Sequence, residues 1–247
     1  MQPKVRLDQA VVVRGLAPSR SRARDLIQRG FVKVDGQVCL KASTGVAPSQ
    51  AVDLADNSPG YVSRGAEKLI AALDYFGFSP AGRVALDIGA STGGFTEVLL
   101  ERGASRVYAI DVGHGQLRAN LCEDPRVVGL EGMDARSLDA SVVPDPVGAI
   151  AADVSFISLT KALPAALHLA APGAWLVALI KPQFEAGPDH VGRGGIVRDA
   201  SIQLQVVNLV ETWIAARSGW AVSGVVPSPI LGGSGNAEFL IGATFSG

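Results

Sequence analysis

Two lysines lie in or next to segments that the sequence pattern predicts to be regular structure. A lysine amine can hold or accept a proton. Lys181 directly follows the apolar run WLVALI, residues 175–180, which is typical of a strand buried on both faces. Burial disfavours the charged form of a lysine, so its ammonium group needs a partner or loses its proton. Lys181 is therefore a candidate base, although a lysine that reaches solvent at a strand end would leave the same pattern.

Two acids and a second lysine also lie within or next to predicted elements. Asp153 ends the predicted strand 147–153 and begins the string DVSF, while Glu238 directly precedes the predicted strand 239–245. Lys68 lies in the predicted helix 66–76, within YVSRGAEKL. Paired acids and amines of this kind are suited to proton transfer and to orienting one another.

A glycine-rich turn follows the predicted strand 83–88, in the string DIGASTGGF, residues 87–95. Such a turn lets a ligand approach the backbone closely. It is not a GxGxxG fingerprint, because Ser91 stands at the second glycine position, and no Gly-Lys-Ser/Thr follows, so it is not a phosphate-binding P-loop. Asp111 ends the next predicted strand, 24 residues after Asp87, where an acid can accept hydrogen bonds from ribose hydroxyls.

Metal-binding side chains are few. The three histidines form no ligand spacing, and the two cysteines, Cys39 and Cys122, lie 83 positions apart without a CxxC pair. The sequence therefore predicts no metal site and no disulfide framework, and it fits a reducing cytoplasm.

Alternating elements must position these residues. Strands are predicted at 83–88, 106–111, 126–130, 147–153, 175–180, 221–226 and 239–245. Helices are predicted at 66–76, 95–102, 158–170 and 201–218. Strands that alternate with helices indicate right-handed βαβ units and a mostly parallel sheet, in which ligands bind beyond the carboxyl ends of the strands.

One apolar stretch approaches the length of a membrane span. Residues 162–180 contain no Asp, Glu, Lys or Arg. Pro164, His168 and the Pro172-Gly173 pair interrupt it, so we expect a helix that ends near Ala171, a turn at Pro172-Gly173 and a buried strand over 175–180.

The formal net charge of -1 conceals two unequal parts. Residues 1–60 carry nine Lys or Arg against five Asp, or +4, which leaves 13 against 18, or -5, for residues 61–247. We predict a small α+β domain over 1–55, a linker over 56–63 and a larger α/β domain over 64–247. In the small domain Ser19 or Ser21 is expected to cap a second helix, and Asp35-Gly36 predicts a hairpin.

The basic part resembles the alpha-L RNA-binding motif of a ribosomal small-subunit protein, pseudouridine synthases and tyrosyl-tRNA synthetases. The resemblance covers about residues 4–50 and rests on Arg6-Leu7-Asp8, the SRSRAR run, Leu26-Ile27 and the Val34-Asp35-Gly36 close. It implies structured RNA bound by shape and backbone contacts. Arginine suits phosphate because its planar fork donates two hydrogen bonds at once. The expected RNA-binding residues are Arg6, Arg20, Arg22, Arg24, Arg29, Lys33, Arg64 and Arg193.

The larger part resembles class I S-adenosylmethionine-dependent methyltransferases, which have a Rossmann-like, seven-stranded, mostly parallel sheet. The resemblance implies S-adenosylmethionine as cofactor. The expected cofactor-binding residues are Asp87, Gly89, Ala90, Ser91, Gly93, Gly94, Phe95, Asp111, Met133, Asp134 and Asp153. Asp111 would hold the ribose and Met133 or Asp134 would flank the adenine. Asp134 as an ordinary turn residue, and Asp87 as a cap of the turn, remain open alternatives.

Lys68, Asp153, Lys181 and Glu238 match in order and context the Lys-Asp-Lys-Glu tetrad of FtsJ-like ribose 2'-O-methyltransferases. The strings YVSRGAEKL, LDIGASTGGFT, DVSFISL, KPQFE and GGIVRD resemble the TlyA/hemolysin A family over nearly the whole chain. The resemblance implies an enzyme that methylates a cytidine 2'-hydroxyl of ribosomal RNA, without a metal.

The tetrad implies a role for each residue. Lys181 would be the general base, Lys68 would supply a neighbouring positive charge, Asp153 would orient Lys181 and Glu238 would position Lys68 or the ribose. The chain ends nine residues after Glu238, which favours the large-subunit RNA alone over both subunit RNAs. The loop 185–195 is expected to close over RNA, with Arg193 on phosphate, although a passive surface loop fits the same residues.

Rival functions remain open on the sequence alone. The fold could serve a non-catalytic RNA-binding or ribosome-assembly factor, a membrane-active hemolysin or a dehydrogenase. The tetrad and the cofactor turn disfavour a non-catalytic factor. The interrupted apolar stretch disfavours a membrane-active hemolysin, and the broken glycine fingerprint disfavours a dehydrogenase. Amine methylation usually uses Asn/Asp-Pro-Pro-Tyr/Phe, and here both prolines are missing after Asp153. Methylation of pyrimidine carbon 5 needs a cysteine at a strand end, which is absent.

Overall fold

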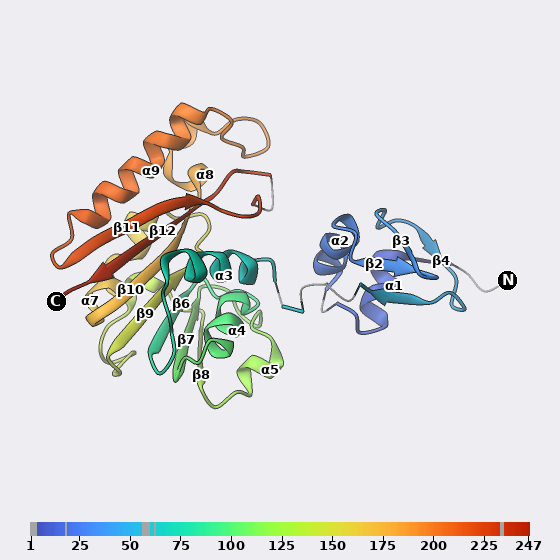
Figure 1. Ribbon diagram of the computed structural model, residues 1–247, viewed down its shortest axis with the longest axis horizontal. Helices are drawn as coiled ribbons and strands as arrows, with labels where there is room; N and C mark the ends of the chain where they lie inside the picture. Colours follow the sequence, from blue (N-terminus) through green and yellow to red (C-terminus); the bar gives the residue numbers. More distant parts are fainter. Residues whose placement is uncertain (1–3, 18, 56–59, 62, 233–234) are drawn as a thin grey trace. The chain divides into compact units, whose positions relative to one another are not determined.

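The computed structural model describes residues 4–17, 19–55, 60–61, 63–232 and 235–247 (Figure 1). The chain divides into two compact units, Met1–Ser63 and Arg64–Gly247. Residues 56–59 and 62 of the predicted linker lie outside the described residues.

The first unit is a small α+β domain. Its elements are β1 (Val5–Arg6), α1 (Leu7–Val13), α2 (Arg20–Gln28), β2 (Val32–Val34), β3 (Gln37–Val38), β4 (Gly45–Val46) and β5 (Val52–Leu54). The strands form two antiparallel sheets, β1-β4 and β3-β2-β5. The Oγ of Ser19 accepts from the backbone N of Arg22 at 3.2 Å, which makes Ser19 the cap of α2. Asp35 and Gly36 both have positive φ, as a tight hairpin turn requires.

Both helices of this unit face one core. Leu7, Ala10 and Val11 of α1 pack with Ala23 and Ile27 of α2, and all are buried. A helix of seven or nine residues is marginal alone, so this shared apolar face stabilises both.

The second unit is a doubly wound α/β domain. Its main elements are α3 (Gly65–Phe76), β6 (Val84–Ile88), α4 (Gly94–Glu101), β7 (Arg106–Asp111), α5 (Ala119–Cys122), β8 (Val127–Glu131), β9 (Val147–Ala152), α6 (Leu159–Ala162), α7 (Pro164–His168), β10 (Ala170–Ile180), α8 (Pro182–Glu185), α9 (Ala200–Ala215), β11 (Trp220–Pro227) and β12 (Phe239–Phe245). Short 3-10 turns lie at Ala135–Ser137 and Pro188–His190.

The strands form one seven-stranded sheet in the order β11-β12-β10-β9-β6-β7-β8. Five strands, from β10 to β8 in this order, are parallel, and β12 is antiparallel to both of its neighbours. This arrangement confirms the predicted mostly parallel, Rossmann-like sheet. The order reverses between β6 and β9, and ligands of such sheets bind beyond the carboxyl ends at this point.

Helices cover both faces of the sheet (Figure 1). Residues of α6, α7 and α9 pack in one core with alternate residues of β6, β9 and β10, such as Leu86, Ile150 and Leu176. On the other face α3 packs against α4 and against β10 and β12. Strands covered on both faces read as continuous apolar runs, which explains the composition of residues 175–180.

The predicted helix 158–170 was wrong in its extent. Two short helices, α6 and α7, replace it, with Pro164 as the first residue of α7. Proline lacks the N–H and its ring disfavours a helical residue before it, so a helix tends to restart there. The predicted turn at Pro172-Gly173 lies within β10, at an irregularity of pairing with β9 between Ala170 and Trp175.

Candidate active site at the carboxyl edge of the sheet

Lys181 lies directly after β10 and pairs with the carboxylate of Asp153, which directly follows β9. Its Nζ contacts Asp153 Oδ1 at 2.5 Å as an ion pair without hydrogen-bond alignment, and donates to Ser155 Oγ at 3.0 Å. Lys181 is 9% exposed, so the ammonium group is largely shielded from water. Parallel β9 and β10 bring Asp153 and Lys181 to one edge of the sheet, because their carboxyl ends point the same way.

A second buried pair lies beside the first. Lys68 Nζ of α3 donates to Glu238 Oε2 at 2.5 Å, and both residues are under 10% exposed. Ile180 and Phe239 are partners in the antiparallel register of β10 and β12. Lys181 follows Ile180 and Glu238 precedes Phe239, so both residues lie just beyond this pair at the same edge of the sheet. The structure thus gathers all four predicted tetrad residues, and each lysine has its own carboxylate. Removing one member of such a pair leaves an uncompensated buried charge.

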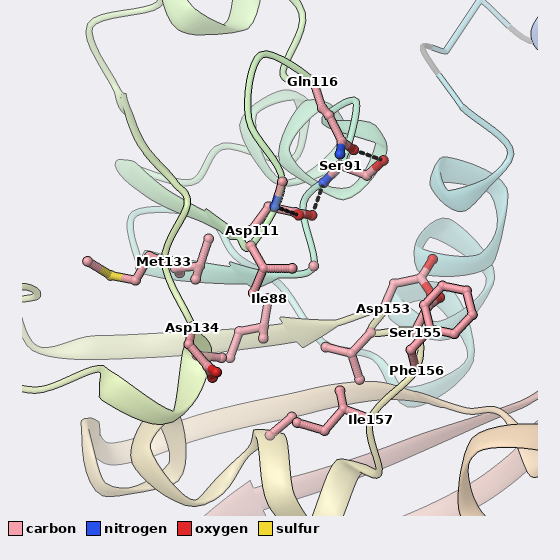
Figure 2. A pocket seen from close by; sticks show the side chains of 17 residues that line it. Ile88, Ser91, Asp111, Gln116, Met133, Asp134, Asp153, Ser155, Phe156 and Ile157 are labelled. Atoms are coloured by element: carbon pink, nitrogen blue, oxygen red, sulfur yellow. Dashed lines mark hydrogen bonds between the residues drawn. The ribbon is translucent and has the colours of Figure 1, made fainter.

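A cavity of about 600 Å³ opens at the same edge (Figure 2). Its walls come from the ends of β6 and β7 and from the segments that follow β6, β7, β8 and β9. Six predicted cofactor-binding residues line it: Gly89, Ser91, Asp111, Met133, Asp134 and Asp153. Five others, Asp87, Ala90, Gly93, Gly94 and Phe95, are buried and are not among the lining residues.

The glycine-rich turn is bent by left-handed residues. Gly89, Ser91 and Gly93 have φ of 84°, 48° and 97°. A Cβ on Gly89 would lie 2.6 Å from the backbone oxygen of Asp153, so only glycine fits between the ends of β6 and β9. Besides letting a ligand approach the backbone, Gly89 thus allows the close approach of the segment that follows β9.

Asp111 organises the cavity through the backbone. Its Oδ2 accepts from Ser91 N at 2.8 Å and its Oδ1 from Gly113 N at 2.7 Å (Figure 2). A carboxylate oxygen can accept more than one hydrogen bond, so acceptor capacity remains toward the cavity.

Glu131, at the end of β8, is a functional candidate that the sequence analysis did not identify. Its carboxylate accepts from three successive backbone N–H groups, those of Gly115, Gln116 and Leu117, at 3.0, 2.7 and 3.1 Å. These hydrogen bonds lower the pKa of Glu131, so it stays ionised. The acid therefore pins the loop 112–117, which contributes three lining residues of the cavity. The sequence feature that could have identified Glu131 is its position at the end of a strand.

Asp87 is fully buried behind the turn. Thr96 Oγ1 donates to its Oδ2 at 2.6 Å, and its Oδ1 has no hydrogen-bond partner within the described residues. Burial raises the pKa of Asp87 to about 7, while the Thr96 hydroxyl partly opposes this. The geometry suits the alternative in which Asp87 supports the turn.

Phe156 is the most exposed large apolar residue at the site. It is 90% exposed, lines the cavity, and has a φ of 65°, which non-glycine residues seldom adopt. Its ring lies 5.0 Å from that of Phe184, between ring centroids. Glu185 fixes the same segment, because its carboxylate accepts from Ser158 Oγ and Leu159 N. Phe156 thus presents an exposed aromatic ring at the cavity that Asp153 also lines.

The predicted RNA-binding residues fall into different environments. Arg6, Arg20 and Arg24 are about half exposed and all bind Asp8. Arg22 is 6% exposed and paired with Asp25, so its guanidinium is not available at the surface. Arg29 also reaches Asp25 and lies over the ring of Phe31. Lys33 lies in β2, Arg64 precedes α3, and Arg193 is exposed in the loop after α8.

Two classes of feature are absent from the part of the chain that the structure describes. No group of three or more His, Cys, Asp or Glu could hold a metal ion there. Among the same residues, every helix is too short or too polar to cross a membrane.

Comparison with known proteins decides the family. The model of the FtsJ-like methyltransferase family matches residues 61–245, and the S4 domain model matches residues 5–52. The chain belongs to the TlyA/hemolysin A family of FtsJ-like methyltransferases, because relatives with both of these names match it over at least 96% of its length. It is accordingly a methyltransferase with an S4 RNA-binding domain, as the sequence resemblance implied.

Relatives agree over nearly the full length. The 16S/23S rRNA (cytidine-2'-O)-methyltransferase TlyA of Mycobacterium tuberculosis is 46% identical over 98% of this chain and 90% of its own. Hemolysin A of Brachyspira hyodysenteriae is 40% identical over 96% of this chain and 98% of its own. A solved Streptococcus thermophilus structure has a TM-score of 0.77 at 38% identity, covering 100% of this chain and 90% of that one. An O-methyltransferase from Bacillus cereus, at 20% identity and a TM-score of 0.52, shares the fold.

Proposed function

We propose that the protein transfers a methyl group from S-adenosylmethionine to the 2'-hydroxyl of a cytidine in ribosomal RNA, with large-subunit rRNA as the main target. The ion pair between the buried Lys181 and Asp153, which lines the cavity, carries the proposal. The activity for which the M. tuberculosis relative is named supports the same reaction. Activity on small-subunit rRNA as well is left to the experiment below.

The cavity fits a nucleoside-based cofactor. At about 600 Å³ it has the size of typical small-molecule pockets. Asp111 would hold the ribose hydroxyls, and Met133 and Asp134, which also line the cavity, would flank the adenine ring. The pKa of Asp134 is lowered to about 2 by the guanidinium of Arg136, so Asp134 is an ionised acceptor at neutral pH. When bound, S-adenosylmethionine supplies a methyl group on a positively charged sulfonium.

Lys181 is proposed as the general base. A ribose 2'-hydroxyl is a weak acid, so an amine within hydrogen-bond reach raises its reactivity by accepting the proton. The amine must be neutral for this role, and Asp153, which contacts Nζ, would orient it toward the ribose. Asp153 also lines the cavity, so its carboxylate would lie near the positive sulfonium of the bound cofactor. Ser155 fixes the direction of Nζ.

Lys68 and Glu238 are proposed to support the reacting ribose. Their short, buried contact places a paired charge beside Lys181 without leaving either group unsatisfied. Asp87 is proposed to hold the glycine turn through Thr96. Ala90, Gly93, Gly94 and Phe95 would likewise shape the turn from behind, because they are buried and do not line the cavity.

RNA contacts are proposed on both units. Phe156 offers an exposed ring on which the target base could stack. Arg6, Arg20, Arg24, Arg29, Lys33, Arg64 and Arg193 are proposed to contact the RNA backbone. Arg22 is omitted from this set because it is buried against Asp25.

A methylation assay tests the proposal. The full chain is incubated with labelled S-adenosylmethionine and purified large or small ribosomal subunits, and ribose methylation is mapped. Lys181→Met should lower the methylation rate by about 10²–10⁴-fold, the usual effect of losing a general base, with cofactor binding retained in calorimetry. Lys161→Met, in an exposed position on α6, is the matched control.

Lys181→Arg separates a base from a simple cation. Arginine keeps the charge but is not deprotonated in proteins, so this variant should be as inactive as Lys181→Met. Full activity of either variant would overturn the assignment of Lys181. Cofactor binding without methylation of either subunit by the wild type would instead favour a non-catalytic RNA-binding role.

A further inference from the structure

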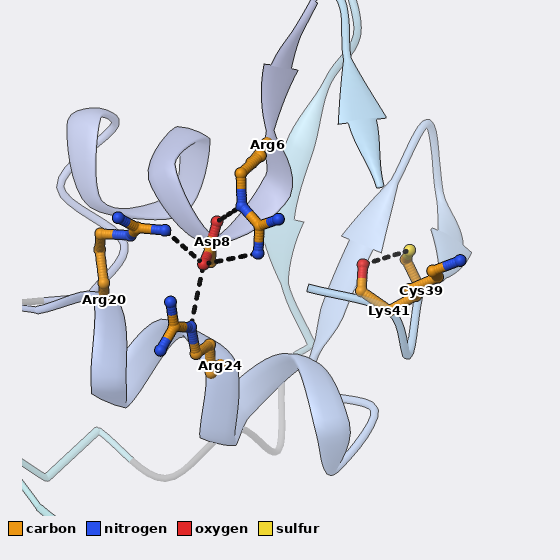
Figure 3. Close-up of polar contacts among 6 residues, drawn as sticks. All are labelled: Arg6, Asp8, Arg20, Arg24, Cys39 and Lys41. Carbon is orange, nitrogen blue, oxygen red and sulfur yellow. Dashed lines mark hydrogen bonds and ion pairs between the residues drawn. The ribbon is translucent and has the colours of Figure 1, made fainter. Parts of the chain in front are cut away.

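One carboxylate in the first unit binds three arginines at once (Figure 3). Asp8, the second residue of α1, is 0% exposed. Arg6 donates to it through Nε at 3.0 Å and Nη2 at 3.2 Å. Arg20 donates through Nη2 and Arg24 through Nε, each at 3.0 Å. The three arginines come from before α1 and from two successive turns of α2, so the tertiary fold assembles this group.

The group is strongly cationic despite its central acid. The hydrogen bond from Arg6, followed by those from Arg20 and Arg24, lowers the pKa of Asp8 far below its usual range. Asp8 is therefore ionised, and three guanidinium groups around one carboxylate leave a net charge of about +2. The arginine side chains are 44, 46 and 50% exposed, whereas Asp8 is inaccessible. The arginine side chains are therefore accessible to solvent, whereas the Asp8 carboxylate is not.

Each arginine keeps donors after binding Asp8. A guanidinium carries five N–H donors, and Arg20 and Arg24 each use a single nitrogen on Asp8. The unused donors belong to side chains that are held by a shared partner rather than free to rotate. Loss of side-chain entropy is a large part of the cost of ordering an arginine on a ligand. Here the arginines are already ordered by Asp8 in the folded protein, so less entropy is lost on binding.

We propose that Arg6, Arg20 and Arg24 form one binding site for a phosphodiester group of RNA, and that Asp8 is its positioning residue. The inference rests on the proposed RNA-binding function and adds to it a defined anion site. Asp8 offsets the mutual repulsion of three like charges and directs them to one place. Without it the arginines would separate into solvent, and the site would lose its geometry although the unit gains positive charge.

The sign of one substitution tests the proposal. Asp8→Asn adds one unit of positive charge, so charge alone predicts tighter RNA binding and a steeper dependence on salt. Positioning predicts the opposite: roughly tenfold weaker binding, the usual effect of losing one charge-assisted hydrogen bond. The log–log salt slope should also shrink by about one unit. Binding of the full chain to deproteinised large-subunit rRNA is measured across a salt series. Asp53→Asn, exposed in β5, is the control with the same charge change.

A second pair of variants covers the case in which Asp8→Asn does not fold, which circular dichroism will reveal. Arg24→Lys keeps the charge but removes the planar fork that binds Asp8 and phosphate together. It should weaken rRNA binding, whereas Arg14→Lys, an exposed arginine that donates to the Gln50 backbone, should not. Wild-type affinity in folded Asp8→Asn, or in Arg24→Lys, would overturn the inference. Absence of rRNA binding by the wild type would count against the proposed function instead.

Discussion

Replacing Asp87 by Asn should change how the stability of the methyltransferase unit depends on pH. Asp87 is wholly buried, with a pKa near 7 in the folded state against 3.8 for an unperturbed aspartate. Between these two values the folded protein holds a proton that the unfolded chain has lost. The folded state is therefore destabilised as pH rises from about 4 to 7, because the deprotonated carboxylate is buried with little compensation.

The size of the effect follows from the two pKa values. Each unit of difference corresponds to about 1.4 kcal/mol, so the wild type carries a cost of about 4 kcal/mol above pH 7. At pH 5 the same reasoning leaves a cost of about 1.5 kcal/mol. Asparagine has no such proton to lose. The stability of Asp87→Asn relative to wild type should thus improve by about 2–3 kcal/mol between pH 5 and pH 8.

Tryptophan fluorescence reports this unit alone. All three tryptophans, Trp175, Trp213 and Trp220, lie beyond residue 64, and two of them are buried. A domain of this size shifts its melting temperature by about 2–4 °C per kcal/mol. The difference in melting temperature between variant and wild type should therefore grow by about 5–10 °C from pH 5 to pH 8.

The control is Asp74→Asn, which removes an exposed carboxylate paired with Arg102 at the surface. It should leave the pH dependence close to that of the wild type, because surface ion pairs contribute little. A melting-temperature difference between Asp87→Asn and wild type that stays constant from pH 5 to pH 8 would refute the reasoning. In that case Asp87 would not retain a proton in the folded state.

Two further predictions concern the walls of the cavity. Glu131→Gln should raise the KM for S-adenosylmethionine roughly three- to tenfold with little change in kcat, because the amide cannot accept all three loop hydrogen bonds; a loss in kcat alone would contradict a role in shaping the pocket. Phe156→Ala should raise the KM for ribosomal subunits by roughly tenfold, within the range for one stacked base, while calorimetric cofactor affinity stays unchanged; unchanged kinetics on subunits would remove Phe156 from the RNA-contacting set.

Local patterns in the sequence predicted most of the elements. Apolar runs placed β6, β7, β9 and β12 to within a residue, because a strand covered on both faces must be continuously apolar. The Asp35-Gly36 pair predicted its hairpin, since few other residues accept positive φ. The helix over 158–170 failed because its apolar periodicity persisted across Pro164, and the proline decided the outcome.

Pairing between distant residues was a matter of the tertiary structure. The family resemblance implied the four tetrad residues and the pairing of Asp153 with Lys181, but it left Glu238 open between Lys68 and the ribose. Lys181 meets Asp153, and Lys68 meets Glu238 from 170 positions away. The register of β10 with β9 and β12 decides these contacts, and periodicity along one strand carries no information about its neighbour's register.

The same limit explains Asp8 and Phe156. Within the sequence Asp8 is one acid among nine basic residues of the first 60, and it looks like a reduction of their charge. Only packing of α1 against α2 makes it the shared partner of arginines 12 and 16 positions away. Phe156 reads as an ordinary apolar residue, until its left-handed backbone turns the ring toward the cavity.

By itself, then, the sequence determined the two-part organisation and the alternating elements, because composition and short-range periodicity encode these directly. Its ordered motifs carried the family resemblance, which in turn implied the residues that can do chemistry. The tertiary structure decided which charges are buried together, which arginines remain at the surface, and which glycines and acids shape the cavity. Those properties depend on contacts between residues far apart in the chain. Such contacts form only once the strand order and register of the sheet are established.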